Sequence, residues 1–264
     1  MSLLDHPLIS QRYFFPRPEA PARPFWIDSN GARLACSYHQ CTAQAPTIVY
    51  FHGNGEVVAD VIDLLPRIFA GMGCNCLLAE YRGYGGSTET PQLGRMLADV
   101  KPTLRALHCA EDRIILFGRS VGSLFAIKAA EECPRVAGLI LESAIADPLE
   151  RLLLRVSPAE LGTTTQKLEA ALQSRLDIAQ ILRHFRQPVL IMHTRHDGLI
   201  DVSHAERLAS WCAGPVRLQI FPRGHHNDIM AVNGREYFRL VAEFIASQIA
   251  MAWGSHGARF RRCE

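Results

Sequence analysis

From residue 47 onward, the chain alternates between short apolar runs of strand length and longer amphipathic runs. Residues 114–117, Ile-Ile-Leu-Phe, are apolar at every position, which is typical of strands covered on both faces of a parallel sheet. The pattern predicts strands at 47–51, 75–81, 113–118, 136–142, 189–193 and 216–221, and helices at 56–70, 93–107, 121–133, 203–212 and 235–251. This alternation predicts an α/β fold with one open, mostly parallel central sheet and helices on both faces.

Prolines and glycines refine this layout. Pro66 and Pro102 lie inside predicted helices and should kink or shorten them, because proline lacks the N–H of the helical hydrogen bond. The dipeptide Asn30-Gly31 is typical of a type I′ turn, so a β-hairpin is expected just before the alternation begins.

Three segments fall outside the alternation. Residues 1–24 carry five prolines and are predicted to form an irregular N-terminal arm, which leaves 25–252 as the main domain. Within that domain, residues 148–175 are helical in pattern and contain no predicted strand, so we expect a small lid there. The C-terminal tail, 253–264, holds three arginines and is expected to be solvated.

The composition excludes several classes of protein. The 264 residues include 28 Lys and Arg against 26 Asp and Glu, a formal net charge of +2, and 48% are hydrophobic. A mostly disordered chain would hold fewer apolar residues, and a dedicated nucleic-acid binder would be strongly basic. The near-neutral charge instead fits a small, weakly charged substrate and no nucleic-acid partner.

The cysteines and the N-terminus indicate the compartment. The close pairs, Cys36 with Cys41 and Cys74 with Cys76, lack the CxxC spacing of zinc or thioredoxin sites, so buried inert thiols and no metal are expected. The first residues lack the basic and apolar regions of a signal peptide, and no run approaches the roughly 18 apolar residues of a membrane span. We expect a cytoplasmic protein without a transmembrane segment; peripheral membrane contact through the termini stays open.

The most informative motif is G-x-S-x-G at residues 118–122. A plain glycine turn with a capping serine would also match this pattern. However, the motif lies between an apolar strand and a helix, which is the position of a nucleophile elbow. In that tight turn a Cβ at Gly118 or Gly122 would collide with the serine segment, so glycine is sterically required at both positions. Ser120 is therefore the candidate nucleophile.

A serine hydroxyl is a poor nucleophile until a base removes its proton. In this layout the acid and then the base follow the serine along the chain. Asp197 lies just past a predicted strand, in a loop at the carboxyl edge of the sheet, although an aspartate there can also simply form a turn. Asp201 and Glu142 are rival acids. His225 and His226 follow the next strand, and either can be the base.

The loop His52-Gly53-Asn54-Gly55 follows the strand at 47–51. Turn chemistry alone would explain it, but beside a nucleophile elbow it takes the position of the second oxyanion donor. We expect the backbone N–H groups of Asn54 and Val121 to point at the developing oxyanion, since small neighbouring residues allow a close approach of the backbone.

The chain resembles the α/β-hydrolase superfamily, and within it the depalmitoylase-like single-domain serine hydrolases with a short helical lid. The segments that carry the likeness are Phe51–Gly55, Glu80–Ser87, Gly118–Gly122, Leu141–Ser143 and Gly224–Asp228. The resemblance implies an α/β-hydrolase fold and no cofactor. It also implies the following site: Ser120 as nucleophile, Asp197 as acid, His226 as base with His225 as the alternative, and Asn54 and Val121 as backbone donors. One departure is Glu80, where relatives often have aspartate.

The implied chemistry is hydrolysis of a carboxylic ester or thioester through a Ser-His-Asp triad and an acyl-enzyme, with a small acyl substrate. A serine peptidase or amidase of the same fold, and a non-catalytic binding protein, stay open as alternatives. The apolar residues of the lid either line an acyl pocket or form a buried core stripe; they are Leu149, Leu152, Leu153, Leu154 and Val156.

Overall fold

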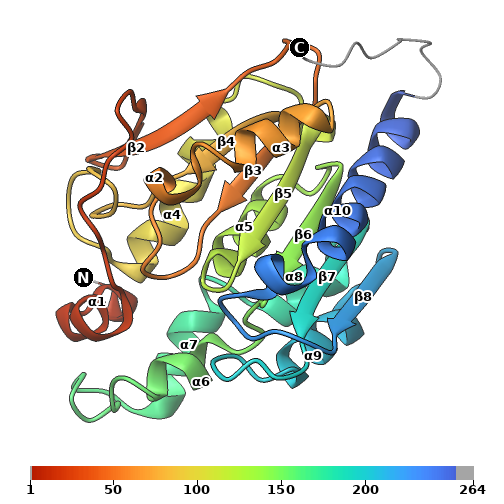
Figure 1. The fold of residues 1–264 in the computed structure, drawn as a ribbon. Coiled ribbons are helices and arrows are strands. Elements are labelled where there is room, and N and C mark those ends of the chain that lie inside the picture. Colours follow the sequence, from red (N-terminus) through yellow and green to blue (C-terminus); the bar gives the residue numbers. More distant parts are fainter. Residues whose placement is uncertain (1, 254–264) are drawn as a thin grey trace.

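The computed structural model describes residues 2–253, which form an eight-stranded sheet in the order β1-β2-β4-β3-β5-β6-β7-β8 (Figure 1). Strands β3 to β8 pair in parallel, whereas β1 and β2 are antiparallel to their neighbours. The predicted fold class is confirmed. The strands are β1 Phe25–Ser29, β2 Ala32–His39, β3 Thr47–Phe51, β4 Asn75–Ala79, β5 Ile114–Arg119, β6 Gly138–Glu142, β7 Val189–Thr194 and β8 Val216–Phe221.

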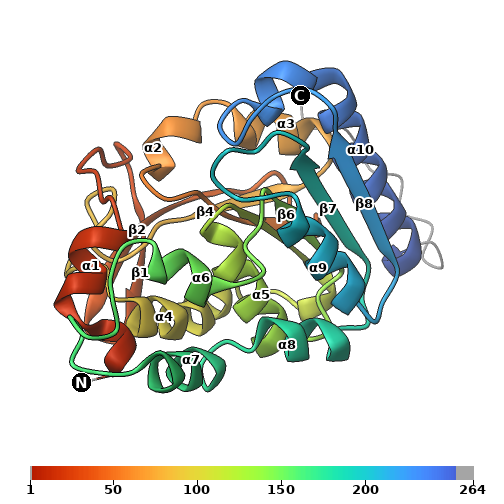
Figure 2. The same ribbon diagram turned by 90° about the horizontal axis from the view of Figure 1, so that it is seen from below.

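Helices cover both faces of the sheet, as Figure 2 shows. On one face lie α2, α3 and α10, whose apolar side chains pack around Phe69 and Phe117. On the other face lie α4, α5, α8 and α9, which pack around Leu124 and Leu182. The bounds are α2 Val58–Val61, α3 Leu65–Gly71, α4 Leu93–Arg105, α5 Gly122–Glu132, α8 Ile178–His184, α9 Ser203–Trp211 and α10 Ile229–Trp253.

The two prolines act differently. The predicted helix at 56–70 is broken into α2 and α3, and Pro66 lies in the first turn of α3, where its missing N–H has no helical partner to lose. Pro102 instead stays inside α4. Because proline has no N–H, Pro102 cannot donate the helical hydrogen bond to the carbonyl of Ala98. The side chain of Asn30 donates to that oxygen instead, with Nδ2 at 3.4 Å. Asn30 and Gly31 have φ of 47° and 84°, as the predicted hairpin turn requires.

The prediction of an irregular arm at 1–24 is wrong for its first half. A 3₁₀ turn at Leu3–Asp5 is followed by α1, Pro7–Tyr13, with His6 capping the helix by accepting a hydrogen bond from Leu8 N at 3.2 Å. Leu4 and Ile9 are completely buried. The proline count misled because Pro7 begins the helix, and a proline in the first turn favours a helix.

The segment predicted as a lid contains two helices, α6 (Pro148–Leu153) and α7 (Thr165–Gln173), which follow β6 and precede α8 in the chain (Figure 1). Most of the predicted C-terminal tail, residues 254–264, lies outside the described residues. Among the helices of residues 2–253, none combines the length and apolar character needed to cross a bilayer.

A buried ion pair ties the loop after β4 to α4. Arg82 is fully buried, and its Nε and Nη2 donate to the two carboxylate oxygens of Asp99 at 2.6 Å each. Ser29 at the end of β1 donates its hydroxyl to the same carboxylate at 2.6 Å. The pair therefore joins three elements at the edge of the sheet that carries the antiparallel strands.

We predict that Asp99→Ala lowers the free energy of unfolding by about 3–5 kcal/mol, because it leaves the Arg82 guanidinium buried without a counter-charge. Chemical denaturation measures this. Asp28→Ala is the matched control. The Asp28 side chain is 88% exposed and lies 3.6 Å from Arg33, and an ion pair this exposed contributes little, so its removal should change stability little. Equal stability of the Asp99→Ala variant and the wild type would contradict the prediction.

Candidate active site

Ser120 lies in a sharp turn between β5 and α5. Its φ is +53°, a strained value for a residue with a side chain. A Cβ at Gly118 would lie 2.6 Å from Ser123 Cα, and a Cβ at Gly122 would lie 2.1 Å from the carbonyl oxygen of Phe51. The Ser123 hydroxyl donates to the Ser120 carbonyl at 2.6 Å and so holds the turn closed. Both positions therefore lack room for a Cβ, but the collisions differ from the expected one: at Gly118 it is with the start of α5, and at Gly122 with the backbone at the end of β3, not with Ser120 itself.

The structure brings three of the predicted site residues into one hydrogen-bonded chain. His226 Nε2 lies 2.9 Å from Ser120 Oγ, and His226 Nδ1 lies 2.7 Å from Asp197 Oδ2. All three side chains come from loops at the carboxyl ends of β5, β7 and β8. An ionised carboxylate only accepts hydrogen bonds, so Nδ1 carries the hydrogen, and Nε2 is left to accept from the serine hydroxyl.

The carboxylate of Asp197 is held by its own loop. Its Oδ1 accepts from the backbone N–H of Leu199 at 2.9 Å and of Ile200 at 2.8 Å. Burial raises the pKa of Asp197, but the hydrogen bonds from His226 and the loop outweigh it and leave the pKa below its ordinary value. Beneath it, His193 Nε2 donates to the Ile200 carbonyl at 2.9 Å, and burial lowers the pKa of this histidine. His193 therefore helps to hold the loop of Asp197, and the sequence pattern did not indicate this role.

The rival residues lie elsewhere. His225 is exposed, and its Nδ1 donates to the carbonyl of His196 at 2.8 Å. Asp201 accepts from the backbone N–H of Ser203 at 2.9 Å, at the start of α9. Glu142 faces Arg119 rather than a histidine. Of these candidates, Asp197 and His226 are the ones in the hydrogen-bonded chain with Ser120.

Asn54 and Val121 line the same cavity as Ser120 and His226, a cavity of about 180 Å³. Val121 is the N-cap residue of α5, where a helix leaves N–H groups without partners inside the helix. The side chain of Asn54 makes three hydrogen bonds: Nδ2 donates to the Tyr13 carbonyl at 2.5 Å, and Oδ1 accepts from Phe15 N at 3.1 Å and from the Tyr84 hydroxyl at 2.8 Å.

Through these hydrogen bonds the N-terminal segment forms part of the candidate site. The sequence pattern did not predict this contact. Tyr13 and Phe15 line the cavity as well as fixing the loop of Asn54. The available signal was the apolar run Tyr13-Phe14-Phe15 among prolines, but its contact partner is about 40 residues away and no local pattern reveals it.

The segment predicted as a lid, called the lid below, contributes arginines to the cavity rather than leucines. Arg151 and Arg155 line it, while none of the lid residues expected as acyl-pocket candidates does. Leu152 and Val156 are buried in the core, and Leu154 is 63% exposed. The core interpretation is therefore correct for Leu152 and Val156.

The buried cysteines take no part in this site. Burial raises the pKa of Cys36 and of Cys74 to about 12, as expected for inert thiols.

Comparison with known proteins places the chain in a family. The family model described as "Serine aminopeptidase, S33" matches residues 42–176, about half of the chain. The chain belongs to this hydrolase family of the α/β-hydrolase superfamily.

Relatives of this hydrolase are distant in sequence. It is 26% identical to Protein bem46 of Schizosaccharomyces pombe over 207 residues, which is 76% of this chain and 67% of the relative. It is 24% identical to human alpha/beta hydrolase domain-containing protein 17B over 226 residues, covering 84% and 74% of the two chains. Among solved structures, Est1E from Butyrivibrio proteoclasticus, described with ferulic acid bound, superposes with a TM-score of 0.71 at 19% identity, covering 86% of this chain and 99% of Est1E.

Glu80 of the hydrolase binds the loop that carries Asn54. Its Oε1 lies 2.7 Å from His52 Nε2, and its Oε2 accepts from Val58 N at 2.9 Å. His52 Nδ1 donates to the Gly53 carbonyl at 2.8 Å. Burial lowers the pKa of His52, but the Glu80 carboxylate outweighs it and raises the pKa above its ordinary value. The longer glutamate thus anchors both ends of the loop.

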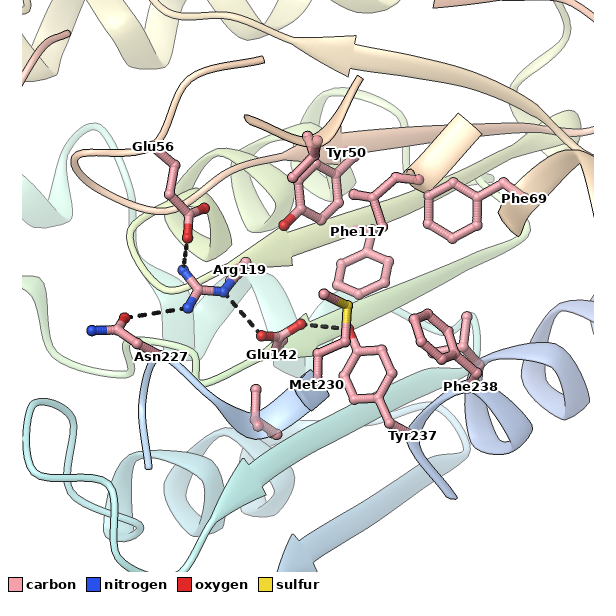
Figure 3. Close-up of a pocket in the computed structure, with 14 residues that line it drawn as sticks. Tyr50, Glu56, Phe69, Phe117, Arg119, Glu142, Asn227, Met230, Tyr237 and Phe238 are labelled. Atoms are coloured by element: carbon pink, nitrogen blue, oxygen red, sulfur yellow. Dashed lines mark hydrogen bonds and ion pairs between the residues drawn. The ribbon is translucent and has the colours of Figure 1, made fainter. Parts of the chain in front are cut away.

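Next to Ser120 in the chain, Arg119 joins the loop of His226 to the sheet. Figure 3 shows its guanidinium between Glu56 and Glu142, with Tyr237 donating to the far oxygen of Glu142 at 2.5 Å. Arg119 Nη2 also donates to the His226 carbonyl at 3.1 Å. A mostly apolar cavity of about 120 Å³ lies beside this cluster. Arg119 therefore positions the backbone of the histidine while two carboxylates balance its charge.

We predict that Gly122→Ala lowers the free energy of unfolding by at least about 2 kcal/mol or prevents folding, because the new methyl group would overlap backbone carbonyls that have no space to move. Gly234→Ala in α10 is the matched control, since a Cβ there has open space, and it should raise stability by about 0.5–1 kcal/mol. Thermal unfolding compares the two. A Gly122→Ala variant as stable as the wild type would mean that the turn does not require glycine.

Proposed function

We propose that this hydrolase cleaves carboxylic ester or thioester bonds through an acyl-enzyme, with Ser120 as nucleophile, His226 as base and Asp197 as the acid that orients it. The observation that carries the proposal is the Ser120–His226–Asp197 hydrogen-bonded chain at the wall of an open cavity.

In the first half-reaction, Ser120 Oγ attacks the carbonyl carbon while its proton passes to His226 Nε2. Asp197 stabilises the resulting imidazolium, and His226 then protonates the leaving alcohol or thiol. In the second half-reaction, His226 takes a proton from water, and the hydroxide attacks the acyl carbon. Ser120 leaves with the proton, and the carboxylic acid is released.

The charge that develops on the carbonyl oxygen needs hydrogen-bond donors that are already in place. We assign this role to the backbone N–H groups of Val121 and Asn54. Val121 begins α5, whose positive dipole end favours an anion. The three hydrogen bonds of the Asn54 side chain restrain the second donor before substrate arrives.

The description of the matching family keeps peptide or amide hydrolysis as the alternative. The same triad can act on amides, where the leaving amine must be protonated by the histidine. Turnover of aminoacyl amides beside a series of para-nitrophenyl esters ranks the two classes. A cytoplasmic location stays a prediction.

We predict that a fluorophosphonate probe labels the wild-type protein and leaves Ser120→Ala unlabelled, because the probe reacts only with an activated serine. Labelling is read on a gel, with the fold of both proteins checked by circular dichroism. No labelling of the wild type, or equal labelling of the variant, would exclude the proposed mechanism and favour a non-catalytic binding protein.

We predict that His226→Ala lowers kcat for ester hydrolysis by about 10⁴-fold, because the serine loses its base. His225→Ala is the matched control and should retain most activity, since His225 points its ring at the His196 carbonyl on the exposed side of the loop. The opposite ranking of the two variants would transfer the base assignment to His225.

A further inference from the structure

We propose that the substrate carries an anionic oxygen group, a carboxylate or a phosphate, which Arg151 and Arg155 of the lid bind while Ser120 attacks the carbonyl. This inference rests on the proposed function and specifies the substrate class of the same site.

The two arginines reach the cavity from the lid. Arg151 lies in α6, and Arg155 lies just after its end, where its backbone N–H donates to the Leu152 carbonyl at 2.9 Å. Both side chains line the cavity that also contains Ser120 and His226. Arg151 is half-buried and Arg155 is exposed, so a substrate whose carbonyl reaches Ser120 meets both guanidinium groups at the wall of the same open cavity.

Neither arginine has a counter-charge in the described part of the chain. No carboxylate of residues 2–253 forms an ion pair with Arg151 or Arg155, and no aspartate or glutamate lines the cavity. The third arginine of the cavity, Arg119, differs because Glu56 and Glu142 balance its charge. The cavity thus presents two unbalanced positive charges next to the nucleophile.

Neighbouring groups keep these charges available. Arg155 lies over the ring of Phe15, with its guanidinium carbon 5.6 Å from the ring centroid, a contact that restrains the side chain without neutralising it. Tyr13 also lines the cavity, and burial raises its pKa to about 12, so its hydroxyl stays protonated and supplies no negative charge.

Guanidinium groups recognise carboxylate and phosphate through paired N–H donors, and their attraction is stronger in a partly enclosed site than in open solvent. Part of the remaining wall is apolar, with Phe15, Ile145 and Leu199, while Asn54 and Asn227 add polar side chains. This mixture fits an ester whose acyl part or leaving group is short and apolar and ends in an anion. The whole-chain charge of +2 predicted a weakly charged substrate, but it averages over surface charges that lie far from the cavity.

The test compares matched anionic and neutral esters in two arms. The acyl arm uses para-nitrophenyl hydrogen adipate against para-nitrophenyl methyl adipate. The leaving-group arm uses 4-acetoxybenzoate against its methyl ester. We expect the wild type to have the higher kcat/KM for the anionic ester in one arm, and the preference to weaken as ionic strength rises.

In the Arg151→Gln/Arg155→Gln double variant, the ratio of kcat/KM for the anionic ester to that for the neutral ester should fall by about 10- to 100-fold. Arg183→Gln is the matched control: it removes the same charge from an exposed position of α8 outside the cavity, and the ratio should stay at the wild-type value.

Two results would overturn this inference: no preference for the anionic ester in either arm, or a preference that survives in the double variant. Fluorophosphonate labelling of the same samples separates this failure from that of the proposed function. Labelled protein that turns over esters without an anionic preference refutes the arginine subsite alone, whereas protein that is not labelled refutes the Ser120 mechanism.

Discussion

The turn at Ser120 is the constraint on which the site depends. A residue with a side chain is held at φ of +53°, and there is no room for a Cβ two residues before it or two residues after it. Such a conformation persists only where the surroundings over-determine it. Here β5 is paired with β3 and β6, and Ser120 N donates to the Glu142 carbonyl at 2.8 Å. The central sheet therefore maintains the strain and projects the hydroxyl from its carboxyl edge.

Around this turn, different parts of the chain supply different functions. Loops of the sheet bring together the three groups of the proposed triad, Ser120, Asp197 and His226. The N-terminal segment and the segment predicted as a lid build part of the wall, and an ion pair at 2.8 Å between Arg12 and Glu160 links them to each other. The part of the wall that these two segments supply lies outside the sheet and does not contact the strained turn through the strand pairs that hold it.

The sequence predicted the parts of the molecule that local pattern determines. The strands from β3 to β7 follow from apolar runs, and the position of the glycine motif between a strand and a helix marks the turn at Ser120. The contact that excludes a Cβ at Gly122 is with Phe51 on another strand, and the local pattern does not contain it. Local pattern could not distinguish His226 from His225, because the two residues are adjacent and have the same sequence context. The course of the backbone after β8 determines which of the two rings faces Ser120. The same holds for Asp197 against Asp201, whose side chain binds its own backbone at Ser203.

What escaped prediction depends on contacts between distant segments. The helix at Pro7–Tyr13 is short, and Leu4 and Ile9 are buried by elements that follow much later in the chain. Leucines and arginines are interspersed within residues 149–156, so the pattern alone could not decide which set faces the site. Packing decides it: Leu152 and Val156 satisfy the core, and the arginines are left to face the cavity. A chain that is nearly neutral overall thus acquires a local positive field where the proposed chemistry takes place, because the burial of one set of lid residues determines where the other set must point.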